Sequence, residues 1–376
     1  MSGIAGLTGR SVTEDQIREM AQKIQHRGPD NTVVKMLPEG GIAACELSLS
    51  QRSTTALAGE SEPFVLLDGE IYNPLGEGQS NADFVRDLYS RKGPMCFSDL
   101  EGSFACVIID QGETILARDE VGARPLIYRT EDNVLCFASE AKALLGCAEE
   151  VEELLPGHYL SSRQGLRPFP AFSPDVPDFD TPEQAAEILR ELMIKAVRKR
   201  MADGAVQGIA LSGGLDSSIT AAIAKTVDPG IKLFSTTIKR YPSKDIEFAK
   251  LMAGFLGLEH HIYEITDEDI VSLLPKIVYY LESFDEDCVS GAIANFYTSR
   301  LISGFTNTIL VGEGADELFG GYFAELKKVE TAREKEEVAM KLVQIAYNTA
   351  LRRLDRGWLA NSVNYRTPFL DPEGVA

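Results

Sequence analysis

The segment Ser212-Gly213-Gly214-Leu215-Asp216-Ser217-Ser218 combines residue types that bind an anion beside a metal ion. Glycines leave backbone N–H groups unobstructed, serine hydroxyls donate to phosphate oxygens, and a following helix start adds a positive dipole. Asp216 supplies a carboxylate of the kind that holds Mg²⁺. The segment lacks the lysine and spacing of a Walker A loop, which disfavours a P-loop triphosphatase. We therefore expect a nucleotide cradle, with a serine-capped glycine turn as the alternative without function.

The elements around this loop predict a parallel sheet. Strand-like runs alternate with helical stretches, a pattern typical of βαβ units and of a doubly wound α/β domain. The predicted strands are residues 206–211, 232–238, 261–265 and 308–311, and a helix is expected over 219–227. Ligands of such sheets bind at the carboxyl ends of strands. We therefore expect backbone contacts to adenine from Leu211 and from the strand end between Thr236 and Ile238.

The N-terminal part of the chain has a different pattern, of short apolar runs bounded by turn residues. The runs at 64–67, 104–109, 114–117 and 135–138, with helices near 14–25 and 82–90, predict an α+β domain. Residues 161–181 hold Pro168, Pro170, Pro174 and Pro177 and are predicted to be a linker. Thr181-Pro182-Glu183-Gln184 has the signature of a capping box that begins a helix. We expect domains at 1–160 and 182–376.

Composition narrows the class of partner. The net charge of −20 disfavours nucleic acid and anionic membranes, because both require a basic surface. No apolar run approaches the roughly 20 residues of a membrane span, and the N-terminus lacks the basic and apolar regions of a signal peptide, which indicates a cytoplasmic protein. The six cysteines form no C-x-x-C pair, so we interpret them as buried thiols.

Two segments of the C-terminal domain resemble known families. The loop 212–218 resembles the pyrophosphate-binding loop of the ATP-pyrophosphatase superfamily, which converts ATP to AMP and pyrophosphate. Residues 312–322 and 366–371, and more weakly 282–285, resemble segments of the asparagine synthetase B family. The resemblance implies that ATP and Mg²⁺ are the cofactors and that Asp216 and Asp316 hold the metal. It places Gly312 at the nucleotide and Glu313 beside an acyl-adenylate, and it implies Glu313, Asp216 and Asp316 as catalytic residues.

The N-terminal domain resembles a class II glutamine amidotransferase domain of the N-terminal-nucleophile type. The similar segments are Met1-Ser2-Gly3-Ile4-Ala5-Gly6, His26-Arg27-Gly28-Pro29-Asp30 and Asp68-Gly69-Glu70-Ile71-Tyr72-Asn73. In that family the residue after the initiator methionine is a nucleophilic cysteine, and here it is Ser2.

Three further positions of that site also depart from the family. The oxyanion-hole asparagine aligns with Asp68, although its neighbour Gly69 is kept. The arginine that grips the glutamine carboxylate aligns with Glu46, and the aspartate that holds its amino group aligns with Asn81. Losing one oxyanion donor typically costs about 10²–10³ in rate, and a carboxylate at the clamp repels the substrate. We predict that Ser2, Glu46, Asp68, Gly69, Glu70 and Asn81 form a degenerate site that no longer hydrolyses glutamine, in a domain kept as a scaffold or docking surface.

Three functions stay open from the sequence. The first is an ATP-dependent ligase of the asparagine synthetase type that uses ammonia directly on a small carboxylate, with aspartate expected. The second is an amidoligase for another carboxylate and amine, as in the β-lactam synthetases, and the third is a silent nucleotide-binding regulator. Members of the family continue past the segment 366–371 and contribute a lysine there, for which Lys327 and Lys328 are unsupported replacements. The resemblance also implies a homodimer.

Overall fold

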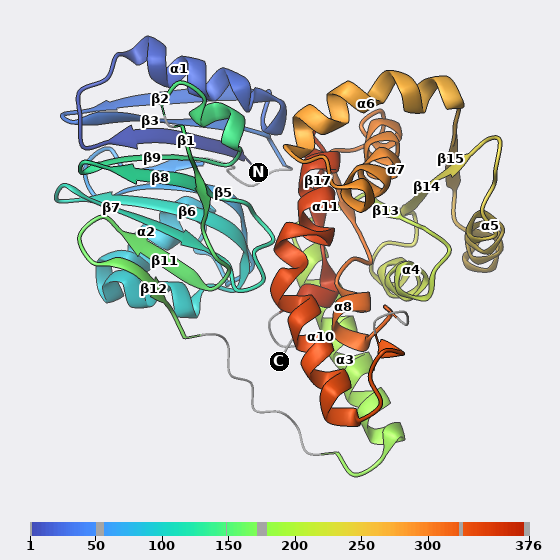
Figure 1. Cartoon of the computed structure of the whole chain (residues 1–376). Coiled ribbons are helices and arrows are strands. Elements are labelled where there is room, and N and C mark those ends of the chain that lie inside the picture. The colour runs from blue at the N-terminus through green and yellow to red at the C-terminus, as the bar shows by residue number, and fades with distance from the viewer. Residues whose placement is uncertain (1, 50–55, 148, 171–178, 323–325, 372–376) are drawn as a thin grey trace. The chain divides into compact units, whose positions relative to one another are not determined.

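The structure is a computed structural model that describes all residues except 1, 50–55, 148, 171–178, 323–325 and 372–376 (Figure 1). The chain forms two compact units, Met1–Ala171 and Phe172–Ala376. No helix among the described residues is long and apolar enough to cross a membrane. The cysteines are free thiols, and all but the half-buried Cys147 are buried.

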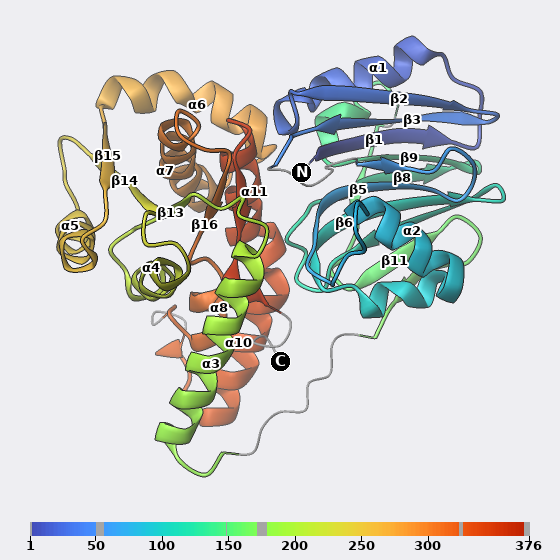
Figure 2. The ribbon, with the colours of Figure 1, turned by 180° about the vertical axis from the view of Figure 1, so that it is seen from behind.

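The first unit contains two antiparallel sheets, with orders β10-β8-β9-β1-β3-β2 and β12-β11-β7-β6-β5-β4 (Figure 2). The strands of the first sheet are β1 (Ser2–Thr8), β2 (Asn31–Leu37), β3 (Gly40–Glu46), β8 (Ile127–Glu131), β9 (Val134–Ala138) and β10 (Glu152–Glu153). Those of the second are β4 (Leu57–Ala58), β5 (Phe64–Ile71), β6 (Gly102–Asp110), β7 (Glu113–Arg118), β11 (His158–Ser161) and β12 (Gly165–Pro168).

Side-chain alternation along these strands separates three apolar layers. Ile4, Leu66 and Val107 belong to a core that draws on both sheets, while Ala5 and Val65 are in cores that cover the outer faces. Helix α1 (Glu14–Lys23) packs on the outer face of the first sheet and α2 (Asn81–Lys92) on that of the second. The short helices are η1 (Gln25–Arg27), η2 (Gly93–Asp99) and η3 (Ala141–Leu144). The result is the four-layer α+β arrangement of N-terminal-nucleophile hydrolases.

In this unit one strand is longer than the sequence pattern indicated, and another lies within the predicted linker. Strand β5 continues from the predicted 64–67 to Ile71, because Asp68, Gly69 and Glu70 pair with β6 despite breaking the apolar run. Within the predicted linker, β12 pairs with β11 in a hairpin. Backbone pairing thus extends the sheet to Pro168, past residue 160.

The second unit is built on a parallel sheet of order β15-β14-β13-β16-β17. Its strands are β13 (Gly208–Ala210), β14 (Lys232–Ile238), β15 (His260–Ile265), β16 (Thr308–Leu310) and β17 (Asn364–Arg366). Its helices are α3 (Pro182–Met201), α4 (Leu215–Val227), α5 (Asp245–Leu256), α6 (Asp267–Leu281), α7 (Glu286–Ile302), α8 (Ala315–Phe319), α10 (Ala332–Ile345) and α11 (Ala350–Leu359), with η4 (Ala346–Asn348) and η5 (Pro368–Leu370).

Helices pack against the sheet in two groups. One core joins α3, α4 and α5 to Ile209 and Leu233 of the central strands, and another joins α6 and α7 to Ile265 of β15. The capping box predicted at Thr181 is present, since its hydroxyl accepts from Gln184 N and the Gln184 side chain accepts from Thr181 N. Parallel strands with helices on both faces confirm the doubly wound α/β prediction.

Candidate functional site

The candidate site lies where the strand order of the second unit reverses. From β13 the chain moves outward to β14 and β15, whereas from β16 it moves the other way to β17. The loops after the adjacent strands β13 and β16 therefore diverge at the carboxyl edge, which is where doubly wound sheets bind ligands. A cavity of about 330 Å³ opens there, and its lining includes Leu211, Thr236 and Gly312 from three strand ends.

The loop after β13 is part loop and part helix. We expected the helix to begin at Ile219, but α4 begins at Leu215 with Gly214 as its N-cap, so Asp216 lies in the first turn. Glycine is accepted at the N-cap of a helix. Because it has no side chain to bond the N–H groups of the first turn, those groups remain open to a ligand. Hydrogen bonds within the loop order it: Ser217 Oγ accepts from Ser212 N at 3.2 Å, and Ser218 Oγ donates to Gly214 O at 2.7 Å.

Only part of this loop lines the cavity. Leu211, Ser212, Asp216 and Ser217 line it, whereas Leu215 is 73% exposed and lies outside the lining together with Gly213, Gly214 and Ser218. Gly213 has a structural requirement of its own, because its φ is +94° and a Cβ there would be 2.0 Å from Asp245 O. Because Gly213 has no Cβ, the loop can contact the start of α5.

The two predicted loops meet through a glycine. A Cβ on Gly312 would lie 2.8 Å from Ser217 N and 3.2 Å from Asp216 Cβ, so the backbone after β16 touches the first turn of α4. Glu313 and Asp316 follow this contact and line the cavity together with Asp216. The structure thus brings together the three acidic residues that the sequence singled out.

Negative charge accumulates at this junction. Burial raises the pKa of Asp216, and the nearby carboxylates of Asp316 and Glu317 raise it further. Burial also raises the pKa of Glu313, with Arg353 acting in the opposite direction. Such shifts mark groups whose charge is incompletely compensated in the protein itself.

The cluster fits a divalent cation that is bound by carboxylates of the protein and by phosphate oxygens of a substrate. No group of three or more His, Cys, Asp or Glu side chains suited to a metal ion occurs in the described part of the chain. Asp216 and Asp316 nevertheless form a pair of carboxylates close enough to raise the pKa of Asp216. Magnesium uses one or two carboxylates and completes its shell with water and substrate phosphates. Asp216 and Asp316 are the residues that would hold it.

The wall formed by β14 and α7 carries the residues expected near adenine. Thr236 Oγ1 lies 3.0 Å from Thr298 Oγ1 of α7, and both residues line the cavity. Ser235 Oγ donates to Leu211 O at 2.5 Å and lies 2.7 Å from His260 Nε2, which fixes the carbonyl group just before the loop. Ile238 is 40% exposed and is not part of the lining.

Several residues that line the cavity were not singled out as functional from the sequence. Glu317 is 4% exposed and accepts a 2.6 Å hydrogen bond from Tyr322 OH; both lie in the segment 312–322, but neither was singled out. Burial and Glu317 raise the pKa of Tyr322. Asn295 belongs to α7, the helix that follows the weakly similar residues 282–285. Trp358, which carries no local motif, also lines the cavity from α11.

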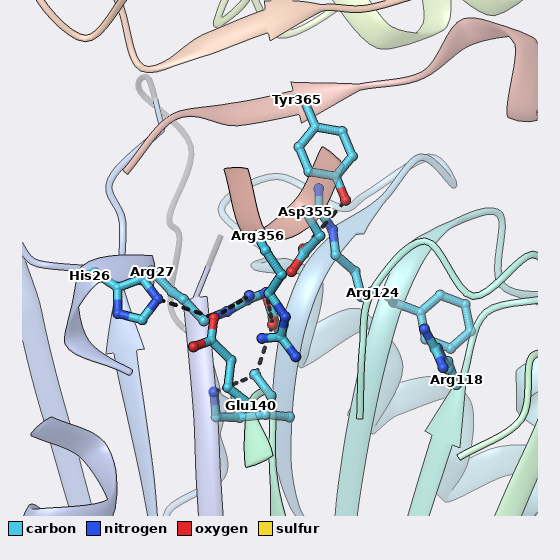
Figure 3. Close-up of polar contacts among 12 residues, drawn as sticks. His26, Arg27, Arg118, Arg124, Glu140, Asp355, Arg356 and Tyr365 are labelled. Atoms are coloured by element: carbon cyan, nitrogen blue, oxygen red, sulfur yellow. Dashed lines mark hydrogen bonds and ion pairs between the residues drawn. The ribbon is translucent and has the colours of Figure 1, made fainter. Parts of the chain in front are cut away.

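In the first unit, Asp68 is fully buried in an ion pair. Arg27 Nη2 donates to Asp68 Oδ2 at 2.8 Å, and Ser139 Oγ donates to the same oxygen at 2.9 Å. Arg27 Nη1 also donates to Glu140 Oε1 at 3.1 Å, and His26 Nε2 lies 3.1 Å from that oxygen (Figure 3). The carboxylate that we expected at the oxyanion-hole position therefore belongs to a network of buried charges.

Glu46 is also committed to local contacts. Its Oε2 accepts from Asn31 Nδ2 and its Oε1 accepts from Ala56 N, both at 2.8 Å. Glu46 pairs across the sheet with Ser2, whose side chain is outside the described part of the structure.

The other predicted residues of this site lie on β5 and α2. Gly69 and the buried Glu70 lie in β5, where a Cβ on Gly69 would be 2.0 Å from Ser103 O. Asn81 begins α2, and its buried Oδ1 has no hydrogen-bond partner among the described residues.

Comparison with known proteins agrees with both halves of the chain. The profile of the Glutamine amidotransferase domain matches residues 1–168, and that of Asparagine synthase matches residues 188–335. Asparagine synthetase [glutamine-hydrolyzing] 3 of Arabidopsis thaliana is 31% identical over all of this chain and 70% of its own length. Asparagine synthetase [glutamine-hydrolyzing] 2 of the same plant is 30% identical over 99% of this chain and 70% of its own.

Among solved structures, the glutamine phosphoribosylpyrophosphate amidotransferase of B. subtilis overlaps with a TM-score of 0.38 at 16% identity, over 69% of this chain and 65% of that one, which is too low to assign a function. The alignments with these two relatives cover 99% and 100% of this chain and therefore include both units. The chain belongs to the asparagine synthetase family.

Proposed function

We propose that the second unit uses ATP to adenylate the side-chain carboxylate of L-aspartate and transfers the acyl group to ammonia, giving L-asparagine, AMP and pyrophosphate. The observation that carries this proposal is the contact between Gly312 and the Ser217 turn. It sets a phosphate-binding helix start beside an acidic loop in one cavity, so a nucleotide and a carboxylate can react there.

The residues divide the chemistry between them. A carboxylate is a poor electrophile until one of its oxygens becomes a good leaving group, and forming an acyl-adenylate achieves this. Ser212, Ser217 and the N–H groups at the start of α4 would bind the departing pyrophosphate. Magnesium, held by Asp216 and Asp316, would neutralise phosphate charge. Thr236 and the backbone of Leu211 would contact the adenosine.

Glu313 is the proposed proton acceptor of the second half-reaction. When ammonia attacks the acyl carbon, the new C–N bond forms, the C–O bond to AMP breaks and the nitrogen must lose a proton. Glu313 lines the cavity three positions before the proposed metal ligand Asp316, and its carboxylate can take that proton.

We propose further that free ammonia is the nitrogen source, because the first unit does not hydrolyse glutamine. The supporting contacts are those of Asp68 and Glu46. Asp68 forms an ion pair with Arg27 in which neither side chain is exposed to solvent. Glu46 accepts hydrogen bonds from the Asn31 side chain and from Ala56 N. Oxyanion stabilisation needs a hydrogen-bond donor at the first position, and glutamine recognition needs a cation at the second. In this unit both positions hold carboxylates, with Asp68 Oδ2 bound by Arg27 and Ser139 and both Glu46 oxygens bound by Asn31 and Ala56 N.

The test measures pyrophosphate release by the full chain with MgATP and L-aspartate, with ammonium chloride or glutamine as the nitrogen source. We expect release and asparagine formation with ammonium, and neither glutamate formation nor turnover with glutamine. Release with another carboxylate and amine, but not with L-aspartate, would reassign the substrate. Release of glutamate at a rate comparable with ATP turnover would refute the ammonia proposal.

A further inference from the structure

Glu313 is paired with a cation from a distant part of the chain. Arg353 Nη2 donates to Glu313 Oε1 at 3.0 Å, and the two side chains are 31% and 26% exposed. Arg353 lies on α11, whereas Glu313 follows β16. The pair therefore ties a residue that lines the cavity to a helix residue 40 positions further along the chain.

A glycine in α7 makes room for this arginine. A Cβ on Gly291 would lie 2.8 Å from Arg353 Cδ, 3.2 Å from its Nε and 3.3 Å from its Nη1. The arginine side chain therefore passes directly over the helix backbone, and any larger residue at 291 would displace it. Gly291 and Glu313 together define where the guanidinium group can be.

The pairing distinguishes the two oxygens of Glu313. Oε1 accepts from Arg353, while Oε2 has no hydrogen-bond partner among the described residues. The short helix α8 that follows Glu313 carries Asp316 and Glu317, whose charges disfavour ionisation of another carboxylate. A guanidinium group at Oε1 offsets that repulsion and fixes the orientation of the carboxylate plane.

We propose that Arg353, seated over Gly291, is a positioning residue that holds Glu313 so that Oε2 accepts the proton of the attacking amine. The inference rests on the proposed function and assigns the second half-reaction, amide formation, as the step that depends on this pair. The proton passes from the nitrogen to Glu313 Oε2 as the C–N bond forms and AMP leaves. Arg353 itself exchanges no proton and does not touch the reacting atoms.

The experiment separates the two half-reactions in the full chain. Exchange of labelled pyrophosphate into ATP with L-aspartate and no ammonium reports adenylation, and asparagine formation with ammonium reports the complete reaction. For Arg353→Gln we expect exchange within about twofold of the unchanged protein and asparagine formation lower by about 10- to 100-fold. Arg353→Lys, which keeps the charge and loses the planar fork, should recover part of the rate. Equal losses in both assays would overturn the proposal.

Three further variants test whether Arg353 has a purely structural role. Gly291→Ala should slow asparagine formation while leaving the melting temperature unchanged or higher, because alanine favours a helix and only displaces the arginine. Glu313→Gln and the double variant Glu313→Gln/Arg353→Gln should be equally slow, since Arg353 acts through Glu313. Rates that fall by the product of the single effects would contradict the coupling.

A matched control is available on α10. Arg333 Nε donates to Glu337 Oε1 at 3.1 Å, and these side chains are 87% and 64% exposed. Arg333→Gln removes the same kind of pair outside the cavity lining and should leave both half-reactions unchanged. Since exchange by the unchanged protein tests the proposed function by itself, the two proposals can fail separately.

Discussion

Arg27 and Asp68 form an ion pair of 2.8 Å in which neither side chain is exposed to solvent. Asp68 is therefore part of the folded core of the first unit and is not available as a ligand-binding group. Its second oxygen, Oδ1, is buried and has no partner among the described residues, so only Oδ2 of the carboxylate is stabilised by hydrogen bonds.

Asp68→Asn restores the residue type of an oxyanion hole but breaks this pair. We expect the free energy of unfolding to fall by about 3–5 kcal/mol, because Arg27 keeps a buried charge with less compensation. We expect no glutamine hydrolysis, since Glu46 remains. Urea denaturation and a glutamate assay measure both outcomes. Asp99→Asn, which removes the exposed 2.7 Å pair with Lys92, should cost no more than about 1 kcal/mol. Appearance of glutaminase activity in the Asp68 variant would contradict our interpretation.

Gly312→Ala tests the contact between the two loops. The added Cβ would be 2.8 Å from Ser217 N, and relief of that overlap must separate Asp216 from Asp316. We expect ATP-dependent pyrophosphate release to fall by about 100-fold, the typical cost of misplacing reacting groups by about 1 Å. Gly254→Ala on α5 is the control, because nothing lies within 4 Å of its added Cβ. It should keep full activity and gain about 0.5–1 kcal/mol of stability.

Asp216→Asn should stabilise the ligand-free protein while abolishing activity. Burial and the charges of Asp316 and Glu317 raise the pKa of Asp216 in the folded state, so the unfolded chain loses this proton first. Stability therefore falls as pH rises from the ordinary value of 3.8 through the raised value, and the penalty persists above it. We expect a higher melting temperature for the variant at pH 7 and a difference that disappears near pH 3. A lower melting temperature at pH 7 would count against the stated origin of the shift.

Magnesium and ATP should stabilise the second unit together. A ligand present at 100 times its dissociation constant adds about 2.7 kcal/mol to the unfolding free energy. We expect MgATP to raise the melting temperature of the unchanged protein, and Asp316→Asn to lose the magnesium-dependent part of the increase. Thermal shift assays with MgATP, and with ATP in EDTA, make the comparison. An increase of the same size in EDTA would argue against a metal site at Asp216 and Asp316.

The sequence was sufficient for the type of fold and for the two loops. Glycines and serines between a strand and a helix predict a phosphate site because these residues act through backbone N–H groups and short hydroxyls, which depend on local geometry. The capping box at Thr181 and strand Lys232–Ile238 follow from equally local patterns. The reversed charge at Glu46 and the added charge at Asp68 are visible in the sequence because a change of charge needs no coordinates to interpret.

The tertiary structure decided which residues share the site. Glu317 and Trp358 were not singled out from the sequence, and they reach the cavity because α8 and α11 pack against it, while Arg353 of α11 contacts the lining residue Glu313. Ile238, which we expected at the strand end, lies outside the lining although it shares a strand face with Thr236, because the lining takes from β14 only Phe234, Ser235 and Thr236 and Ile238 lies two residues further along. The pairing of Asp68 with Arg27 likewise depends on the close approach of β5 to η1, a contact between distant residues that no local pattern encodes.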